Sequence, residues 1–140
     1  MIEFIIGYID EIYISESKII DSQLNINLSL EDDFNFIKEF RPLEITTLID
    51  NFISNSEKAG ANSISFIFSK KNSNLIIEVI DNGSKTISVE NLNKIFDLGF
   101  TTTNGTGIGL FQTKDIINRL NGHITVESEK GKGTKFTITL

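Results

Sequence analysis

The stretch Asn104-Gly105-Thr106-Gly107-Ile108-Gly109-Leu110 (NGTGIGL) decides how the rest of this chain is interpreted. Its three glycines stand at every second position, and each would cost conformational entropy inside a helix or a strand. The residues that follow, FQTKDIINRL, have a helical pattern, so the glycines open a helix. Backbone N–H groups and the helix dipole converge at such a turn, which favours an anion, usually phosphate. A flexible glycine-rich linker is the alternative, and the surrounding sequence must decide between the two.

Composition and charge narrow the functional classes. The chain has 140 residues, the size of one domain, and 39% of them are hydrophobic, which suits a globular core. Its 13 basic and 19 acidic residues give a formal charge of −6, which disfavours non-specific nucleic-acid binding. A phosphate compound would therefore be held through a cation and backbone amides. The absence of cysteine excludes a disulfide framework, a thiolate nucleophile and a cysteine zinc site.

Strand patterns recur along the chain, as alternation of apolar and polar residues or as short apolar runs. They predict strands over 24–30, 64–68, 75–80, 123–128 and 135–140, and the glycine-containing segment EKGKGT joins the last two as a hairpin. Helices are expected over residues 1–20, 43–60, 88–96 and 110–120, the last with Leu110, Ile117 and Leu120 on its buried side. A turn is expected at 31–33. There is no internal repeat and no convincing linker.

The N-terminal helix has apolar residues at Ile5, Tyr8, Ile9 and Ile12. Either it packs on the domain, or it is the end of a dimerising helix of a longer protein. Acidic residues interrupt its apolar stretch and no basic leader precedes it, so it is expected to be neither a signal peptide nor a membrane span. We therefore expect an N-terminal helical segment at 1–22, followed by one domain at 23–140.

The helix that follows Pro42 is the most informative one. Its core stripe has i, i+3, i+4 spacing and consists of Ile45, Leu48, Ile49, Phe52, Ile53 and Ser56. Asn51, Asn55 and Lys58 line a neighbouring face together. Asparagine is a mediocre helix former, so two of them one turn apart favour a binding function over a merely solvated polar face. Gly60 is expected to end the helix.

Two further polar positions have both a functional and a structural interpretation. Asp81, in Asp81-Asn82-Gly83, ends an apolar strand and is either a turn former or an acceptor at a pocket mouth. His123 is the only histidine, and a structural or solvated role is expected because one histidine makes no metal cluster. The chain has no GxxxxGK[ST] motif, and FTTTN rather than a strand precedes the glycines, which argues against a dinucleotide-binding Rossmann unit.

Taken in order, these segments resemble the GHKL superfamily of ATP-binding domains, and most closely the catalytic domain of histidine kinases (HATPase_c). NFISNSEKA is similar to the family's N box, DNG to its first glycine box, IFDLGFTTT to its F box and lid, and GTGIGL to its second glycine box. The resemblance covers residues from about 24 to 140. It implies an α+β fold, the Bergerat two-layer α/β sandwich, in which a mixed, mainly antiparallel sheet has helices packed on one face.

The chemistry of these residues suits Mg²⁺-ATP. Magnesium prefers hard oxygen ligands, so the Asn55 amide oxygen and phosphate oxygens would hold it. Lys58 offers a point charge to phosphate, and Asn51 can orient a water or a phosphate oxygen. An ionised Asp81 accepts a hydrogen bond from the adenine amine, which GTP lacks.

The resemblance assigns the same roles to the matching positions. Asn51 and Lys58 are then catalytic, and Asn55 binds the metal. The nucleotide-binding set that it implies is Asp81, Gly83, Phe100, Thr101, Gly105, Thr106, Gly107, Ile108, Gly109, Leu110 and Thr134.

The resemblance also implies an activity. Hydrolysing members have a glutamate one helical turn before the metal-binding asparagine, whereas this chain has Asn51, and an amide cannot accept a proton at neutral pH. The leading hypothesis is a cytoplasmic kinase domain that donates the γ-phosphate to a histidine on a separate phosphoacceptor domain. A response regulator would be an indirect partner, and membrane attachment would come only through upstream segments. The alternatives are a non-catalytic nucleotide-sensing or scaffold module, an ATPase, and a serine kinase of the anti-sigma type.

Two features depart from the family pattern. Lys85 stands where the first glycine box usually has a second glycine, and its side chain is either solvated or reaches the nucleotide. The lid between Phe96 and Gly105 is short, so few phosphate contacts are expected from it.

Overall fold

Residues 1–15, 23–31, 34–101 and 105–140 are described by the computed structural model of the chain. Its helices are α1 (Ile2–Ile9), α2 (Pro42–Lys58) and α3 (Gly109–Arg119), with a π-helix η1 (Asp10–Ser15) and a 3₁₀-helix η3 (Val89–Asn91). Its strands are β1 (Asn25–Leu30), β2 (Ser63–Lys71), β3 (Asn74–Asp81), β4 (His123–Glu129) and β5 (Gly133–Thr139). The predicted strands are all found.

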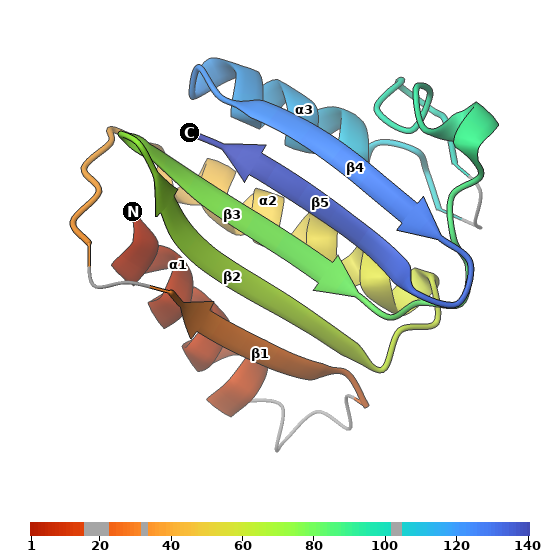
Figure 1. Ribbon diagram of the computed structural model, residues 1–140, viewed down its shortest axis with the longest axis horizontal. Coiled ribbons are helices and arrows are strands. Elements are labelled where there is room, and N and C mark those ends of the chain that lie inside the picture. The colour runs from red at the N-terminus through yellow and green to blue at the C-terminus, as the bar shows by residue number, and fades with distance from the viewer. Residues whose placement is uncertain (16–22, 32–33, 102–104) are drawn as a thin grey trace.

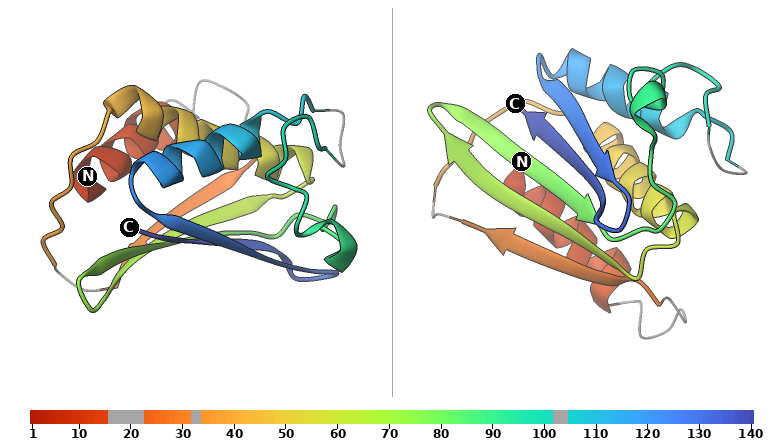
Figure 2. Two further views of the ribbon diagram at one scale, coloured as in Figure 1. Left: turned by 90° about the horizontal axis from the view of Figure 1, so that it is seen from above. Right: turned by 45° about the vertical axis from the view of Figure 1, so that its right-hand side comes forward.

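The described strands form one sheet in the order β1-β2-β3-β5-β4. β1 runs parallel to β2, and the other neighbouring pairs are antiparallel. α1, α2 and α3 lie on the same face of this sheet, as two views of the ribbon show (Figures 1 and 2). The predicted two-layer α+β sandwich with a mixed, mainly antiparallel sheet is therefore confirmed.

The central helix α2 packs as its sequence pattern predicts. Pro42 is its first residue, where the missing N–H costs nothing, and Gly60 follows its end at a φ of +76°. All six residues of the predicted stripe are buried, among them Phe52, whose ring lies 5.2 Å from that of Phe136 on β5. The buried stripe of α2 therefore faces the sheet, and Asn51 and Asn55 lie on the face of α2 next to this stripe.

α1 packs into the same core as α2 and the sheet. Ile2, Ile5 and Ile9 on one side of α1 are buried, and all belong to the single hydrophobic cluster that includes the α2 stripe. In the structure α1 thus packs on the domain, and its continuation as the end of a dimerising helix stays a prediction. Residues 16–22, where the two predicted segments meet, lie outside the described residues. No described helix has the length and apolar character that crossing a bilayer requires.

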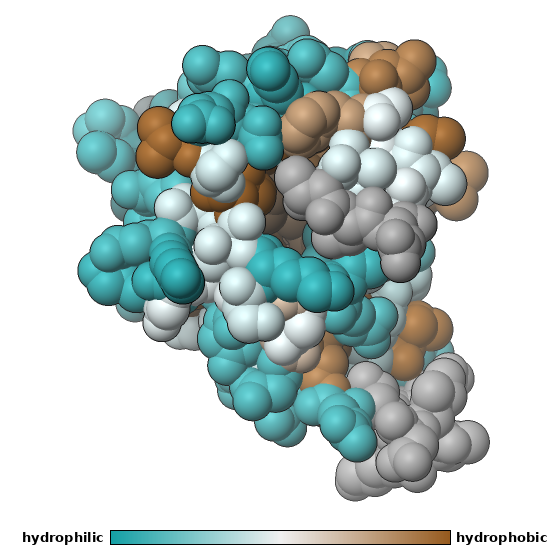
Figure 3. All heavy atoms as spheres, turned by 90° about the vertical axis from the view of Figure 1, so that its right-hand side faces the viewer, coloured by the Kyte–Doolittle hydropathy of each residue, from teal (hydrophilic) through white to brown (hydrophobic). Residues whose placement is uncertain are grey.

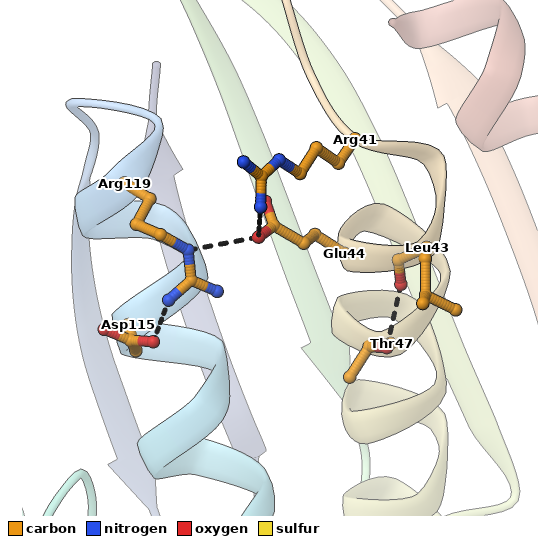
Figure 4. Close-up of polar contacts among 6 residues, drawn as sticks. All are labelled: Arg41, Leu43, Glu44, Thr47, Asp115 and Arg119. Atoms are coloured by element: carbon orange, nitrogen blue, oxygen red, sulfur yellow. Dashed lines mark hydrogen bonds and ion pairs between the residues drawn. The ribbon is translucent and has the colours of Figure 1, made fainter.

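A surface ion-pair network joins the start of α2 to the end of α3 (Figure 4). The Arg119 side chain donates from Nε to Glu44 over 3.1 Å and also pairs with Asp115 one turn earlier on α3. Arg41 approaches the same Glu44 oxygen at 3.8 Å. Glu44 is the most buried of these groups, with 20% of its side chain exposed, and the other side chains are exposed. Of these pairs, Arg119–Glu44 links α3 to α2, and exposed pairs contribute little energy.

Three expectations need correction or lie beyond the structure. The helix predicted over 88–96 is wrong: only η3 forms, followed by turns, because so short a segment supplies few propagating hydrogen bonds to offset nucleation. Leu110 is only half-buried, and Thr113 and Ile116 take the buried side of α3 with Ile117 and Leu120. Residues 32–33 of the predicted turn are outside the described residues.

Candidate functional site

A cavity of about 290 Å³ opens beside the C-terminal half of α2, at the end of β3 and the start of β5. The loop after β3 and the glycine-rich turn before α3 form its remaining walls. Viewed from this side, the molecule is hollowed and hydrophobic atoms show within the hollow (Figure 3). The cavity thus lies where helix, sheet and glycine turn meet.

The structure gathers nearly all the predicted site residues around this one cavity. Its wall includes Asn51, Asn55, Lys58, Asp81, Phe100, Thr101, Gly105, Thr106, Gly107, Ile108, Gly109, Leu110 and Thr134. Gly83 does not line the cavity. Residues 102–104, which include Asn104 of the opening stretch and part of the expected lid, lie outside the described residues.

Asp81 is a buried carboxylate at the closed end of the cavity. Only 7% of the residue is exposed, and Oδ1 accepts a 2.8 Å hydrogen bond from the Gly83 N–H. The Ser56 hydroxyl lies 3.4 Å from Oδ2. Burial raises the pKa of Asp81, and the hydrogen bonds from Gly83, Ser56 and the Thr134 backbone oppose that rise. Asp81 is therefore a fixed acceptor in a low-dielectric wall.

Gly83 does not line the cavity, but its N–H holds the Asp81 carboxylate in place. A Cβ on Gly83 would lie 2.7 Å from the Cβ of Ala59 and 3.0 Å from Asp81 Oδ1. Only glycine allows the chain to pass the end of α2 this closely while its N–H still points at the carboxylate. Its expected direct contact with the base remains a prediction.

Asn51 and Asn55 lie one turn apart on the same wall but have different partners. The Asn51 amide nitrogen donates to the Gly109 carbonyl over 3.0 Å and lies 3.4 Å from the Thr113 hydroxyl. In the described part of the chain, the Asn55 amide nitrogen is buried without a hydrogen-bond partner. Buried polar atoms are rarely left in this state, so Asn55 is the group on this wall that is ready for a ligand.

The glycine-rich turn is held by backbone contacts in addition to the Asn51 side chain. The Gly99 N–H donates to the Gly107 carbonyl over 3.0 Å, and a Cβ on Gly107 would overlap the carbonyl carbon of Gly99. Gly107 also has a φ of +70°, in the region that favours glycine. The turn ends at α3, whose first residues, Gly109 and Leu110, face the cavity. Among the described residues no side chain caps this helix, and its first N–H groups suit an anion.

Several cavity residues were not predicted as site residues from the sequence. They are Ser54, Ala59, Lys85, Ile87, Ile95, Gln112 and Phe136. Lys85 was noted as a departure, and its exposed side chain lines the wall. The Ile87 N–H donates to the Ser128 hydroxyl on β4 over 2.8 Å, which anchors the loop after β3. Gln112 lies one helical turn after Gly109, so its spacing could have placed it at the cavity. The apolar residues of the cavity have the same sequence pattern as core residues and could not have been recognised.

These residues suit a nucleotide with a divalent cation. The amide nitrogen of Asn55, unpaired within the described residues, is a donor and suits a phosphate oxygen, while the amide oxygen of the same side chain could serve as a single protein ligand for magnesium. The uncapped start of α3 and Lys58 suit phosphate, and the buried Asp81 suits a base amine. The cavity therefore has an acceptor at one end and anion-binding groups at the other.

Comparison with known proteins identifies the family. Residues 41–140 match the family described as "Histidine kinase-, DNA gyrase B-, and HSP90-like ATPase" (HATPase_c). This chain belongs to that family. The match begins one residue before α2 and runs to the C-terminus, so the HATPase_c region contains every predicted site residue.

The chain is also similar to sensor kinases. It is 36% identical over 131 residues to a probable C4-dicarboxylate sensor kinase of Halalkalibacterium halodurans, an alignment that covers 84% of this chain and 24% of that protein. The chain spans about a quarter of the length of the curated relatives it matches. It is therefore a HATPase_c catalytic domain of the histidine kinase type, homologous to one part of these proteins.

Solved structures share the fold. The catalytic domain of histidine kinase ThkA has a TM-score of 0.79 and 24% identity, with 100% of this chain and 91% of that one covered. Full-length ShkA in complex with AMPPNP has a TM-score of 0.81 and 18% identity, with 99% of this chain and 29% of that one covered. At these identities the likeness concerns the fold alone.

Proposed function

We propose that this HATPase_c domain binds Mg²⁺-ATP in the described cavity and donates the γ-phosphate to a histidine on a separate phosphoacceptor domain. The observation that carries the proposal is the convergence of Asp81, Asn55 and the Gly105–Gly109 turn on one cavity. The family assignment and the sensor kinases among the relatives support it. The AMPPNP complex of ShkA supports a nucleotide as the ligand of this fold.

The proposed roles follow the geometry of the cavity. Asp81, held by Gly83 and flanked by Ser56 and Thr134, accepts a hydrogen bond from the adenine amine. Asn55 supplies an oxygen to Mg²⁺, which would neutralise charge on the phosphate oxygens. Lys58 adds a point charge, and the N–H groups at Gly107 and Gly109 bind phosphate.

Asn51 supports phosphate transfer over hydrolysis. Its side chain is an amide, which cannot take a proton from water at neutral pH, and its nitrogen is already bonded to the Gly109 carbonyl. Asn51 therefore positions the start of α3 instead of activating a water molecule. We propose the catalytic contribution of Asn51 and Lys58 as orientation and charge, respectively, without a general base from α2.

The activity is tested with γ-³²P-labelled ATP, the domain and a histidine phosphoacceptor domain, either in one polypeptide or as separate proteins. We expect acid-labile, alkali-stable label on the acceptor, as for phosphohistidine. Label that accumulates only as inorganic phosphate would indicate an ATPase, and binding without transfer would indicate a nucleotide-sensing module.

The role of Asn55 is tested by metal dependence. Asn55→Ala removes the proposed Mg²⁺ ligand, so added magnesium should no longer increase the affinity for an ATP analogue in calorimetry. Ser54→Ala, a neighbouring substitution on the same cavity wall, serves as the matched control and should keep the magnesium effect. Magnesium dependence that persists in Asn55→Ala would place the metal on another residue.

A further inference from the structure

Two tyrosines near the N-terminus hold one carboxylate of α2. The Tyr8 hydroxyl donates to Asp50 Oδ1 over 2.8 Å, and the Tyr13 hydroxyl donates to the same oxygen over 2.5 Å. The two rings meet edge to face, with centroids 6.1 Å apart at 80°. We call Tyr8, Asp50 and Tyr13 the tyrosine clamp. All three side chains are half-buried, and the cluster is separate from the nucleotide cavity.

The clamp depends on an unusual helix. Tyr8 lies in α1 and Tyr13 in the π-helix η1, five positions later. In a continuous α-helix, residues five apart point about 140° away from each other, because each residue adds roughly 100°. The wider π-helix turn brings them close to one direction. The π-helix is therefore what lets both hydroxyls reach a single carboxylate.

The electrostatics favour the same arrangement. Burial, followed by the hydrogen bond to Asp50 and its charge, raises the pKa of Tyr8 to about 12, and the same causes raise the pKa of Tyr13. Both phenols therefore keep their protons and remain donors at neutral pH. Hydrogen bonds to a charged acceptor are stronger than neutral ones, so the clamp offsets part of the cost of the rare helical form.

The residue after Asp50 reaches the nucleotide cavity. Asn51 donates to the Gly109 carbonyl and lies beside the hydroxyl of Thr113, which is completely buried on α3. A Cβ on Gly109 would lie 3.3 Å from Asn51 Oδ1, so the two groups pack closely. Two successive residues of α2 thus bind η1 on one side and the glycine-rich turn on the other.

We propose that Asp50 is a positioning residue, and that the tyrosine clamp sets where Asn51 holds the glycine-rich turn, so that the arrangement of residues 1–15 controls ATP affinity. The proposal rests on the function proposed above and names a regulatory input to the same site. If η1 rewinds as an α-helix, Tyr13 turns away and Asp50 loses one donor. The side of α2 that carries Asp50 then loses this contact, which moves Asn51 relative to the phosphate-binding amides.

The coupling must act in both directions. If the clamp changes ATP affinity, then ATP binding changes the clamp by the same free energy. The chain contains two tyrosines and no tryptophan, and both tyrosines belong to the clamp. Its tyrosine emission therefore reports the state of the clamp without any added label.

The test compares the unsubstituted protein with Tyr13→Phe and Asp50→Asn. Phe4→Leu is the control, because Phe4 packs on Phe40 from α1 without touching Asp50. Calorimetry with Mg²⁺-AMPPNP should show affinity reduced about fivefold in Tyr13→Phe and Asp50→Asn, and by less than twofold in Phe4→Leu. Adenosine, which lacks phosphates, should bind all four proteins within about twofold. Far-ultraviolet circular dichroism checks that each variant is folded.

The tyrosine emission of the unsubstituted protein gives a second readout that needs no variant. AMPPNP should change it, and adenosine at equal absorbance should not. Unchanged AMPPNP affinity in both folded variants, together with unchanged emission, overturns the clamp while leaving nucleotide binding intact. Equal losses for AMPPNP and adenosine would also overturn it, because the clamp would then act on overall stability. Failure of the unsubstituted protein to bind AMPPNP overturns both the proposed function and the clamp.

Discussion

The two ends of the cavity are constructed differently. At the closed end, Asp81 terminates a central strand, pairs in register with Thr134 of β5 and is flanked by Ser56 of α2. At the other end, the contacts described for the Gly105–Gly109 turn include the backbone contact between Gly99 and Gly107 and the hydrogen bond from the Asn51 amide. One end is therefore fixed by regular elements, and the other is held by a few local bonds.

This difference suggests a division of labour. A buried acceptor with fixed partners suits discrimination between bases, because a mismatched ligand leaves the carboxylate unpaired. A backbone turn with few anchors suits a site whose affinity is adjusted, because small shifts of α2 or α3 alter several amides together. We expect substitutions at the closed end to affect adenine recognition and those at the glycine end to affect phosphate binding.

The largest effect is expected at Asp81. Asp81→Asn replaces a carboxylate by an amide and removes the charge-assisted bond to the adenine amine, at a cost of about 2 to 3 kcal/mol, or roughly 30- to 150-fold in ATP affinity. Adenosine should lose about the same factor, because both ligands share the base. Glu78→Gln, on the same strand but on the open face of the sheet, is the control and should bind normally. Equal affinity of Asp81→Asn and the unsubstituted protein in calorimetry would refute the adenine assignment.

Low pH should reversibly reduce ATP affinity in the same way as Asp81→Asn, because it protonates the Asp81 carboxylate. Burial raises the pKa of Asp81 above its usual value, so the folded protein holds this proton more tightly than the unfolded chain does. As the pH falls through that raised pKa, the carboxylate is lost and ATP affinity decreases, while protonation of this group favours the folded state. Dissociation constants for adenosine, which has no titrating phosphate, should show the decrease in affinity across the acidic range in the unsubstituted protein and not in Asp81→Asn. A parallel slope in both would assign the pH dependence elsewhere.

A smaller effect is expected at Gly107. Gly107→Ala introduces a side chain at positive φ and against Gly99, and we expect ATP affinity to fall about tenfold with adenosine affinity unchanged. Gly131→Ala carries a similar conformational cost at a φ of +85° in the β4–β5 hairpin but meets nothing within 4 Å. It should therefore lower stability without lowering affinity. Equal losses for ATP and adenosine in Gly107→Ala would make the turn a hinge only.

The sequence predicted the regular elements and the α2 residues of the cavity from the same periodic signal. The stripe of α2 and the alternation of the strands are set by burial, which leaves a periodic signal in the chain. That signal placed Asn51, Asn55 and Lys58 on one face, and the structure brings them to one cavity wall. Asp81 and the glycines were predicted from the chemistry of strand ends and glycine-rich turns and from the family resemblance, and their roles stay predictions.

The features that the sequence did not reveal depend on distant contacts. In the sequence, Ser56 is a small residue of the core stripe and Thr113 has no distinguishing pattern. In the structure, the buried Ser56 hydroxyl lies beside Asp81 and the buried Thr113 hydroxyl lies beside Asn51. The π-helix that brings Tyr13 to Asp50 is not encoded in a local period, because the bond spans 37 positions. The segment 88–96 has apolar residues at helical spacing, yet it is too short to offset helix nucleation and forms η3 followed by turns.

The smallest effect is expected at Ser56. Its hydroxyl lies 3.4 Å from Asp81 Oδ2 and 3.0 Å from the Phe52 carbonyl, so it shares one proton between two acceptors. Ser56→Ala should weaken ATP binding about two- to fivefold, corresponding to roughly 0.5 to 1 kcal/mol, and adenosine by the same factor. Ser69→Ala, on the open face of β2, is the control. A larger loss for ATP than for adenosine would mean that the two ends are not independent.

We propose a single ATP cavity in which Asp81, at the closed end, recognises adenine. Titration calorimetry of the unsubstituted protein with AMPPNP and with the matching guanine analogue, both with magnesium, tests it most directly. We predict saturable binding of one AMPPNP per chain and an affinity for the guanine analogue at least tenfold lower, because guanine has a carbonyl where adenine has an amine. Equal binding of the two nucleotides, or no binding of AMPPNP, would contradict the account.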